Sequence, residues 1–320
     1  MKDCGMQQGG ALISDGSEDS TEKEMMILQP NAKLQKRRKA ILFLVLASVF
    51  WSTAGLAIKW IPWPAQVIGS FRGGVSFLAL LLFFRIFYGK WPPLPGGEVL
   101  PAAICYMVLT QSFVVANKLT TSANAILLQY SAPAWLLLFS AVFLKEKIKL
   151  RDILIVAVIF GGMSLFFLDS LEVGGMAGNF VAIFSGVVMA VMLMLMKRIR
   201  RAKPIETVLW GNLIAFFVGL PFYQSVVLTP RSMLAASYLG VFQLGVAYIF
   251  YTFAITEVST MEAILIPMIE PLLNPLWVFL GTGERPSHFA LIGGAIVVSA
   301  VVYRSLTETS EEGAAAEEAG

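Results

Sequence analysis

Ten apolar segments of roughly membrane-spanning length follow one another along this chain. A helix needs about 20 apolar residues to cross the hydrocarbon core of a bilayer, and charged residues make up only 14% of the sequence. We therefore expect an all-α membrane protein with ten transmembrane helices. Nine is the alternative count, because only Lys118 and a threonine-rich turn separate the third and fourth segments. The segments lie near residues 40–58, 65–85, 98–117, 121–143, 151–168, 179–197, 205–224, 233–254, 259–280 and 288–303.

The sequence also repeats itself at an offset of 138 residues. The stretch TSANAILLQYSAPAWLLLFSAVFLKE at 121–146 is echoed by STMEAILIPMIEPLLNPLWVFLGTGE at 259–284. A duplication of apolar segments on this scale is a common mark of a secondary transporter. We expect one repeat at 40–168 and a second at 179–304, with five helices in each. The offset carries Lys59 onto Lys197, Pro133 onto Pro271, Glu146 onto Glu284 and Ala125-Ile126-Leu127 onto Ala263-Ile264-Leu265.

Basic residues predict the orientation of the helices. They gather at alternate helix ends, near positions 36–39, 85–90, 145–151, 197–203 and 304. Because cytoplasmic loops are enriched in Lys and Arg, both termini are expected in the cytoplasm. Five helices per repeat is an odd number, so the second repeat enters the membrane upside down relative to the first. The opposite ends receive only Lys59, Lys118, Arg231 and Arg285.

The polar ends and the composition exclude several classes of function. Residues 1–39 and the acidic residues 305–320 have the composition of disordered tails, although KLQKRRK at 33–39 also marks the cytoplasmic side. A net charge of +3 gives no reason to expect a nucleic-acid partner, and His288 is the only histidine. Neither H-E-x-x-H nor G-x-x-x-x-G-K occurs. We therefore expect no enzyme, no cofactor and no metal.

Residues 40–304 resemble the drug/metabolite transporter superfamily, specifically its ten-helix EamA family. The segments that carry the resemblance lie at 122–148 and 261–286, with FWSTAGLAIK at 50–59 and SFRGGVSFLALLL at 70–82. The resemblance implies a central pocket lined by both halves, through which small organic metabolites move, often outward. The ninth segment departs from the family, because it carries three prolines where one near the glutamate is usual.

Charge inside a predicted span is the sharpest functional signal, because it costs about 2.5–3.5 kcal/mol at a helix centre. Arg72 lies within the second segment, Glu270 lies near the middle of the ninth, and Glu262 lies two turns earlier. Two interpretations stay open for Arg72 and Glu270. They could pair and hold the bundle together, or they could bind substrate and protons and couple the two by meeting in one state and separating in the other.

Pro267, Pro271 and Pro275 recur every four residues of the ninth segment and so share one face. Each proline lacks an N–H and frees the carbonyl four residues earlier. Free carbonyls at membrane depth are tolerated only against protein or a wet cavity. We expect this face to look into the bundle and to take part in gating, and a kink that serves packing alone is the alternative.

Further polar side chains lie in other apolar segments, and each is a candidate for substrate binding or for a contact between helices. Tyr251 belongs to the same group, and Trp51 is a weaker candidate. The candidates for substrate binding, beside Arg72 and Glu270, are Gln111, Asn124, Gln129, Tyr130, Gln243, Tyr248 and Asn274.

These patterns predict a secondary transporter for a small organic solute, an amino acid or a related metabolite, exported across a bacterial inner membrane by alternating access. The lipid bilayer is the second partner and a proton is a candidate third. The oligomeric state is left open. Two alternatives are a non-transporting membrane protein, such as a lipid-handling enzyme or a scaffold, and a flippase for lipid-linked sugars.

Overall fold

Helices are the regular elements of this protein. The computed structural model describes residues 35–143, 150–173, 175–199, 202–255, 257–258 and 266–318, and within these ranges every regular element is helical. Residues 35–52 form the first helix, which continues after a turn as α2. The other elements of the first half are α3 (Ala65–Phe87), α4 (Val99–Leu119), α5 (Ser122–Gln129), α6 (Ala132–Phe143) and α7 (Leu150–Val173), and α2 itself is Ala54–Trp60.

The remaining elements belong to the second half of the chain. It consists of α8 (Met176–Arg198), α9 (Pro204–Gly219), η1 (Leu220–Ser225), α10 (Pro230–Tyr238), η2 (Leu239–Val246), α11 (Ala247–Ala254), η3 (Ile266–Met268), α13 (Ile269–Thr282) and α14 (His288–Glu318). The element η2 is a π-helix. It follows α10 and precedes α11 without a break, so the three elements form one continuous helical segment.

Six helices among the described residues are long and apolar enough to cross a membrane. The chain is therefore a multi-pass membrane protein. Two shorter apolar helices cover Ile153–Leu165 and His288–Tyr303, where the fifth and tenth spans are expected. The expected fourth span is divided into α5 and α6, and part of the ninth lies outside the described residues. The six helices are Gln35–Trp60, Ala65–Phe87, Val99–Leu119, Met176–Met196, Pro204–Gln224 and Pro230–Ala254.

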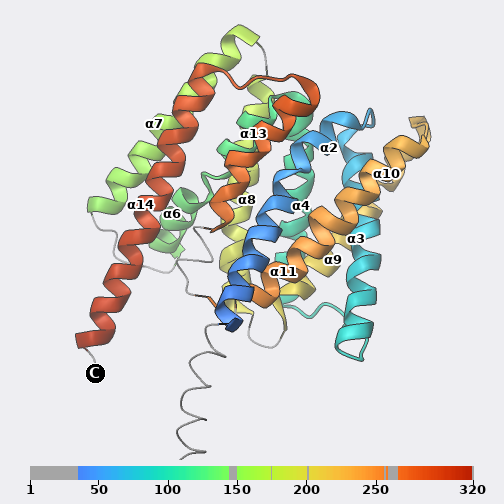
Figure 1. The fold of residues 1–320 in the computed structure, drawn as a ribbon, viewed down its shortest axis with the longest axis horizontal. Helices are drawn as coiled ribbons and strands as arrows, with labels where there is room; N and C mark the ends of the chain where they lie inside the picture. The colour runs from blue at the N-terminus through green and yellow to red at the C-terminus, as the bar shows by residue number, and fades with distance from the viewer. Residues whose placement is uncertain are drawn as a thin grey trace, which may run out of the picture.

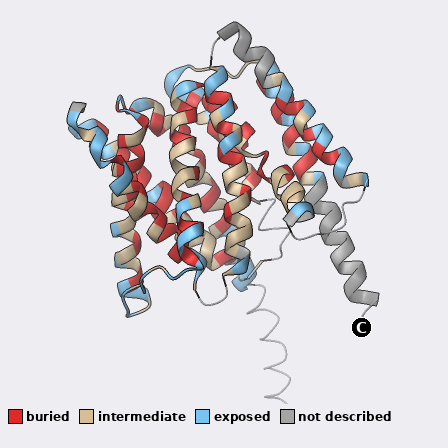
Figure 2. Ribbon diagram, turned by 180° about the vertical axis from the view of Figure 1, so that it is seen from behind, coloured by how far each residue is buried: buried red, intermediate tan, exposed pale blue. Residues whose placement is uncertain are grey.

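Most of the helices form one bundle, and α7 and α14 pack against each other at its side (Figure 1). In the bundle α4 packs against α8 and α9, and α3 packs against α9 and η2. Small residues allow the close approach, because an added Cβ at Gly73 would lie 2.9 Å from the carbonyl oxygen of Asn212 on α9. Buried residues face the centre of the bundle and exposed ones its outside (Figure 2).

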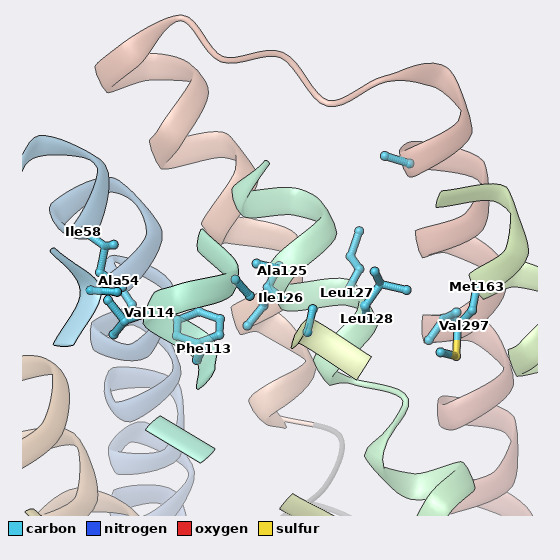
Figure 3. Packing of buried hydrophobic residues seen from close by; sticks show 14 of the residues in the cluster. Ala54, Ile58, Phe113, Val114, Ala125, Ile126, Leu127, Leu128, Met163 and Val297 are labelled. Atoms are coloured by element: carbon cyan, nitrogen blue, oxygen red, sulfur yellow. The ribbon is translucent and has the colours of Figure 1, made fainter. Parts of the chain in front are cut away.

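The repeated Ala125-Ile126-Leu127 stretch lies in the main apolar core. Ala125 and Ile126 are fully buried, and the core also includes Phe113 and Val114 of α4 and Ile58 of α2 (Figure 3). On the other side of the same cluster Met163 of α7 and Val297 of α14 lie together. The short helix α5 thus joins the bundle to the α7–α14 pair.

The expected tails differ from the structure at both ends. The first helix begins at Gln35, inside the tail expected at 1–39, and residues 1–34 lie outside the described part of the chain. At the other end α14 continues to Glu318, through the segment expected to be an unstructured tail from 305. Alanine and glutamate are strong helix formers, so the AAAEE sequence prolongs the preceding helix.

Candidate functional site

Tyr130 and Glu270 form the centre of the candidate site. The Tyr130 hydroxyl lies 2.8 Å from Oε2 of Glu270 and 3.1 Å from the carbonyl oxygen of Pro267, and it can donate to either. The Pro267 carbonyl lacks a helical donor because residue 271, four positions later, is a proline. The predicted free carbonyl therefore exists and faces protein, where a hydroxyl from the other half of the chain reaches it.

The three prolines play different structural parts. Pro267 lies in the single turn of η3, Pro271 lies in the first turn of α13, and Pro275 lies inside that helix. In a first helical turn the backbone N–H has no intrahelical partner anyway, so proline is well tolerated there. Among the described residues, Pro275 is the proline that lies in a helix interior, where it frees the carbonyl of Pro271.

Arg72 is fully enclosed, with 1% of its surface exposed. Its guanidinium donates to Oε1 of Gln243 at 3.3 Å and to the carbonyl oxygen of Thr110 at 2.8 Å. Both Arg72 and Glu270 belong to the described residues, and they do not form an ion pair with each other in this structure. Arg72 instead joins α3 to α4 and to the π-helix η2. Such π-helical turns occur frequently at functional sites.

Aromatic rings occupy the region between Arg72 and Glu270. Tyr248 lies within electrostatic range of both side chains. Its ring centroid is 5.6 Å from that of Tyr106 and 5.1 Å from that of Trp51. The Trp51 ring is also 5.4 Å from Tyr251. The indole N–H of Trp51 has no hydrogen-bond partner in the described protein.

Four polar side chains at and around Glu270 are not fully buried. Tyr130, Tyr248, Tyr251 and Glu270 each keep part of their surface accessible. Side chains in a packed core, such as Tyr106 at 0% exposure, keep none. A partly accessible carboxylate on a membrane-spanning segment is a candidate contact for a small molecule.

The remaining predicted residues lie elsewhere. Gln111 packs against Gly69 of α3, and its amide atoms have no protein partner. Asn124 donates to Asn179 at 3.2 Å, and Asn274 is fully buried beside Gly55 and Ser122. Gln129 ends α5, where its carbonyl lies close to Gly186 of α8. Glu262 lies outside the described residues.

A second polar group closes one end of the bundle. Lys59 Nζ lies 2.9 Å from Oε2 of Glu284 and donates to the carbonyl oxygen of Thr120 at 3.0 Å. The other carboxylate oxygen of Glu284 accepts from the backbone N–H of Ser122 at 2.8 Å. Lys118 donates to the carbonyl oxygen of Ile61 beside this group. The first helix, α5 and the end of α13 are thereby held together.

A pocket of about 420 Å³ opens near the same end, lined by Trp60, Arg231, Leu234 and Ala235. It contains none of the residues predicted to bind substrate. Among the described residues no three His, Cys, Asp or Glu side chains gather in a way that could hold a metal ion.

Sequence reasoning missed Tyr106 and the role of Lys59 and Glu284. Tyr106 lies in an apolar run where nothing distinguishes it from a core aromatic residue. Lys59 and Glu284 are landmarks of the repeat, but the sequence does not show that they meet. Their positions in different halves, each at the end of an apolar segment, were the available signal.

These features define a helical, multi-pass membrane protein with a polar centre built from several helices, as in many transporters. The chain belongs to the EamA-like transporter family, whose model matches residues 38–168 and again residues 176–306. The starts of the two matched ranges are 138 residues apart, and so are their ends. This is the offset at which the sequence repeats.

Curated relatives of the chain are described as transporters. An "uncharacterized transporter" of Archaeoglobus fulgidus is 25% identical over 81% of this chain and 93% of its own length. The "uncharacterized transporter YwfM" of Bacillus subtilis is 25% identical over 83% of this chain and 95% of its own. A solved structure described only as the crystal structure of a protein matches with a TM-score of 0.58 and 22% identity, covering 83% of this chain and 97% of that one. That likeness concerns the fold.

Proposed function

We propose that this protein is a secondary transporter of ten transmembrane helices that exports a small organic solute, an amino acid or a related metabolite, across a bacterial inner membrane. Transport proceeds by alternating access between two inverted repeats, 40–168 and 179–304. The observation that carries the proposal is the partly accessible polar group formed by Tyr130, Tyr248 and Glu270, in which the Tyr130 hydroxyl lies 2.8 Å from Oε2 of Glu270. One of these residues belongs to the first repeat and two belong to the second.

The helix boundaries support a duplicated architecture. α3, the helix that contains Arg72, covers Ala65–Phe87, and its counterpart α9 with η1 covers Pro204–Ser225. The starts of these two segments are 139 residues apart and their ends 138, close to or at the sequence offset. An odd number of helices per repeat then makes the two halves antiparallel in the membrane.

The packing of the helices is consistent with two interchangeable halves. When each element is replaced by its counterpart in the other half, the α3–α9 pair and the α7–α14 pair each map onto themselves. The α6–α8 pair maps onto the α13–α2 pair, and the α4–α9 pair maps onto the η2–α3 pair. Because the two halves make equivalent contacts, each half can adopt the conformation of the other. Such a swap would open the centre of the bundle to the opposite side of the membrane.

Flux through reconstituted protein tests the proposal. Proteoliposomes loaded with a mixture of the twenty common amino acids should lose specific solutes faster than protein-free liposomes. A Glu270→Gln variant should lose them more slowly. Mass spectrometry of the external medium measures the loss.

Comparison of metabolites exported by cells that overexpress or lack the gene extends the search beyond amino acids. The proposal fails if no solute leaves faster than from empty liposomes. Scrambling of labelled lipid in the same vesicles would point to the flippase alternative.

A further inference from the structure

We infer that the transported solute carries an ammonium group, which binds to the Glu270 carboxylate inside an aromatic box formed by Trp51, Tyr130, Tyr248 and Tyr251. The inference rests on the proposed function, because it specifies the solute that the same site accepts. Neither the family nor the named relatives specify this chemistry.

The charge of the site favours a cation. Glu270 accepts one hydrogen bond, from Tyr130, and no cationic side chain of the described protein forms an ion pair with it. An ionised carboxylate enclosed in a membrane protein is costly unless a cation or several donors approach it. A bound ammonium group would supply both the charge and up to three donors.

Aromatic rings complete a site for the same chemical group. Tyr248 lies within electrostatic range of Glu270 and of Tyr251, and Trp51 contacts both tyrosine rings. A cation near the face of an aromatic ring is attracted by the ring quadrupole, most strongly by tryptophan. The rings would thus contribute attraction on the sides that the carboxylate leaves open.

Arg72 does not offer an equivalent site for an anion. Its side chain is 1% exposed, whereas the box residues remain partly accessible. Two of its nitrogens already donate, to Gln243 and to the Thr110 carbonyl. It therefore acts as a positioning residue that holds η2, and with it Tyr248, against α3 and α4.

Tyr130 provides a way for Glu270 to exchange partners. Its hydroxyl lies between Oε2 of Glu270 and the Pro267 carbonyl oxygen, and it has one hydrogen to donate. When an ammonium group takes Oε2, the hydroxyl can turn to the Pro267 carbonyl without losing a hydrogen bond. The solute therefore does not leave a buried donor without an acceptor, which would otherwise weaken binding.

Thermal unfolding of the purified full chain in detergent tests the inference. The probes are butylammonium, butyrate and neutral butanol, at equal ionic strength. Butylammonium should raise the unfolding temperature in a saturable way, because a ligand that binds the folded state stabilises it. Butyrate and butanol should not. Glu270→Gln should weaken the apparent affinity for butylammonium about tenfold or more, since it removes a charge-assisted hydrogen bond.

Two matched comparisons separate binding from general damage. Glu257→Gln removes an exposed carboxylate beyond α11 and should leave the affinity unchanged. Tyr251→Leu removes a ring of the box and should bind butylammonium about two- to fivefold more weakly, whereas Tyr303→Leu removes an exposed ring of α14 and should bind it as the wild type does. This comparison applies even if Glu270→Gln fails to fold.

The outcomes also distinguish this inference from the proposed function. Equal stabilisation by butyrate and butylammonium, or an affinity that Glu270→Gln and Tyr251→Leu leave unchanged, would overturn the ammonium site. If an anionic or neutral solute nevertheless leaves proteoliposomes, transport stands and only the solute class is wrong. Binding of butylammonium without flux of any amine would leave the site in place and refute transport.

Discussion

At the scale of single residues, Tyr130 links the two halves of the chain through one hydroxyl group. It comes from the turn between α5 and α6, and its two acceptors lie on η3 and α13. This hydroxyl contacts Glu270, whereas Arg72 donates a hydrogen bond to Gln243 of η2. The structure thus gives the two charged residues separate partners. The hypothesis that Arg72 and Glu270 alternate between meeting and parting therefore concerns a second state of the protein.

Glu270→Gln tests the charge at the centre. A carboxylate binds a cation only when it is deprotonated, so falling pH should weaken wild-type butylammonium binding and solute flux. The groups that face Glu270 are Tyr130 and Tyr248, and Tyr251 lies beside both tyrosines. Each is a neutral phenol near pH 7. The glutamine variant should show lower flux with no pH dependence. Flux measured with and without an imposed pH gradient checks this, and unchanged pH-driven flux would leave Glu270 a structural residue.

Arg72→Ala tests the role of the buried guanidinium. The variant should lower the free energy of unfolding by about 1–3 kcal/mol, because Gln243 Oε1 loses its donor in a buried setting. The loss of packing adds to this. Arg231→Ala removes an exposed arginine from α10 and should leave the unfolding temperature nearly unchanged. Equal effects of the two substitutions would contradict the positioning role.

At the scale of elements, corresponding prolines begin corresponding helices. Pro133 is the second residue of α6 and Pro271 is the third residue of α13. Each follows a break in its segment, at Tyr130–Ser131 and at η3. Proline is stable in a first turn but cannot extend a helix backward. In both repeats the backbone therefore departs from α-helical geometry just before the corresponding proline, next to the candidate site.

Glu284→Ala tests the closed end of the bundle. The Ser122 N–H loses its acceptor and Lys59 its ion-pair partner, so the start of α5 should open more often. Hydrogen exchange measured by mass spectrometry should be faster over residues 121–129. The pair is only about three-quarters buried, with side-chain exposures of 21% and 25%, so the loss of stability should be about 1 kcal/mol or less. Arg285→Ala, one residue on and exposed, should not change exchange over 121–129.

At the scale of the whole molecule, the distribution of basic residues predicts the orientation in the membrane. A cysteine at position 176 in a background without Cys4 and Cys105 should react with an impermeant reagent from outside intact cells, and one at position 202 should not. Met176 is 39% exposed. It is a better site than Gly175, whose φ of 102° strains any other residue. The reverse labelling pattern would refute two inverted repeats with cytoplasmic termini.

The duplication also makes a prediction about the opposite end. The offset carries Lys59 onto Lys197 and brings Glu284 back to Glu146, which lies outside the described residues. If the halves exchange conformations, Glu146→Ala should destabilise the state that is closed at the opposite end. It should thereby favour the state that is closed at the end where Lys59 and Glu284 meet. Hydrogen exchange over 121–129 should then become slower than in the wild type. Faster exchange there would argue against a symmetric exchange.

Hydropathy, the repeat and the helical class could all be inferred from the order of residues alone, because they depend on neighbours within a segment. About 20 apolar residues in a row suit a bilayer whatever surrounds them, and the EamA match at 38–168 and 176–306 confirms the family that Thr121–Glu146 and its echo suggested. The freed carbonyl of Pro267 was predictable for the same reason, since a missing N–H is a local property.

The partners of the polar groups could be decided only by the tertiary structure. Arg72 and Glu270 are the two charges that sequence reasoning brought together, but Arg72 contacts Gln243 and Thr110, and Glu270 contacts Tyr130. Lys59 meets Glu284 across 225 positions of the chain. Electrostatic and hydrogen-bonding energies depend on separations of a few ångströms between segments. Only the packing of α3, α4, α5, η2 and α13 determines those separations.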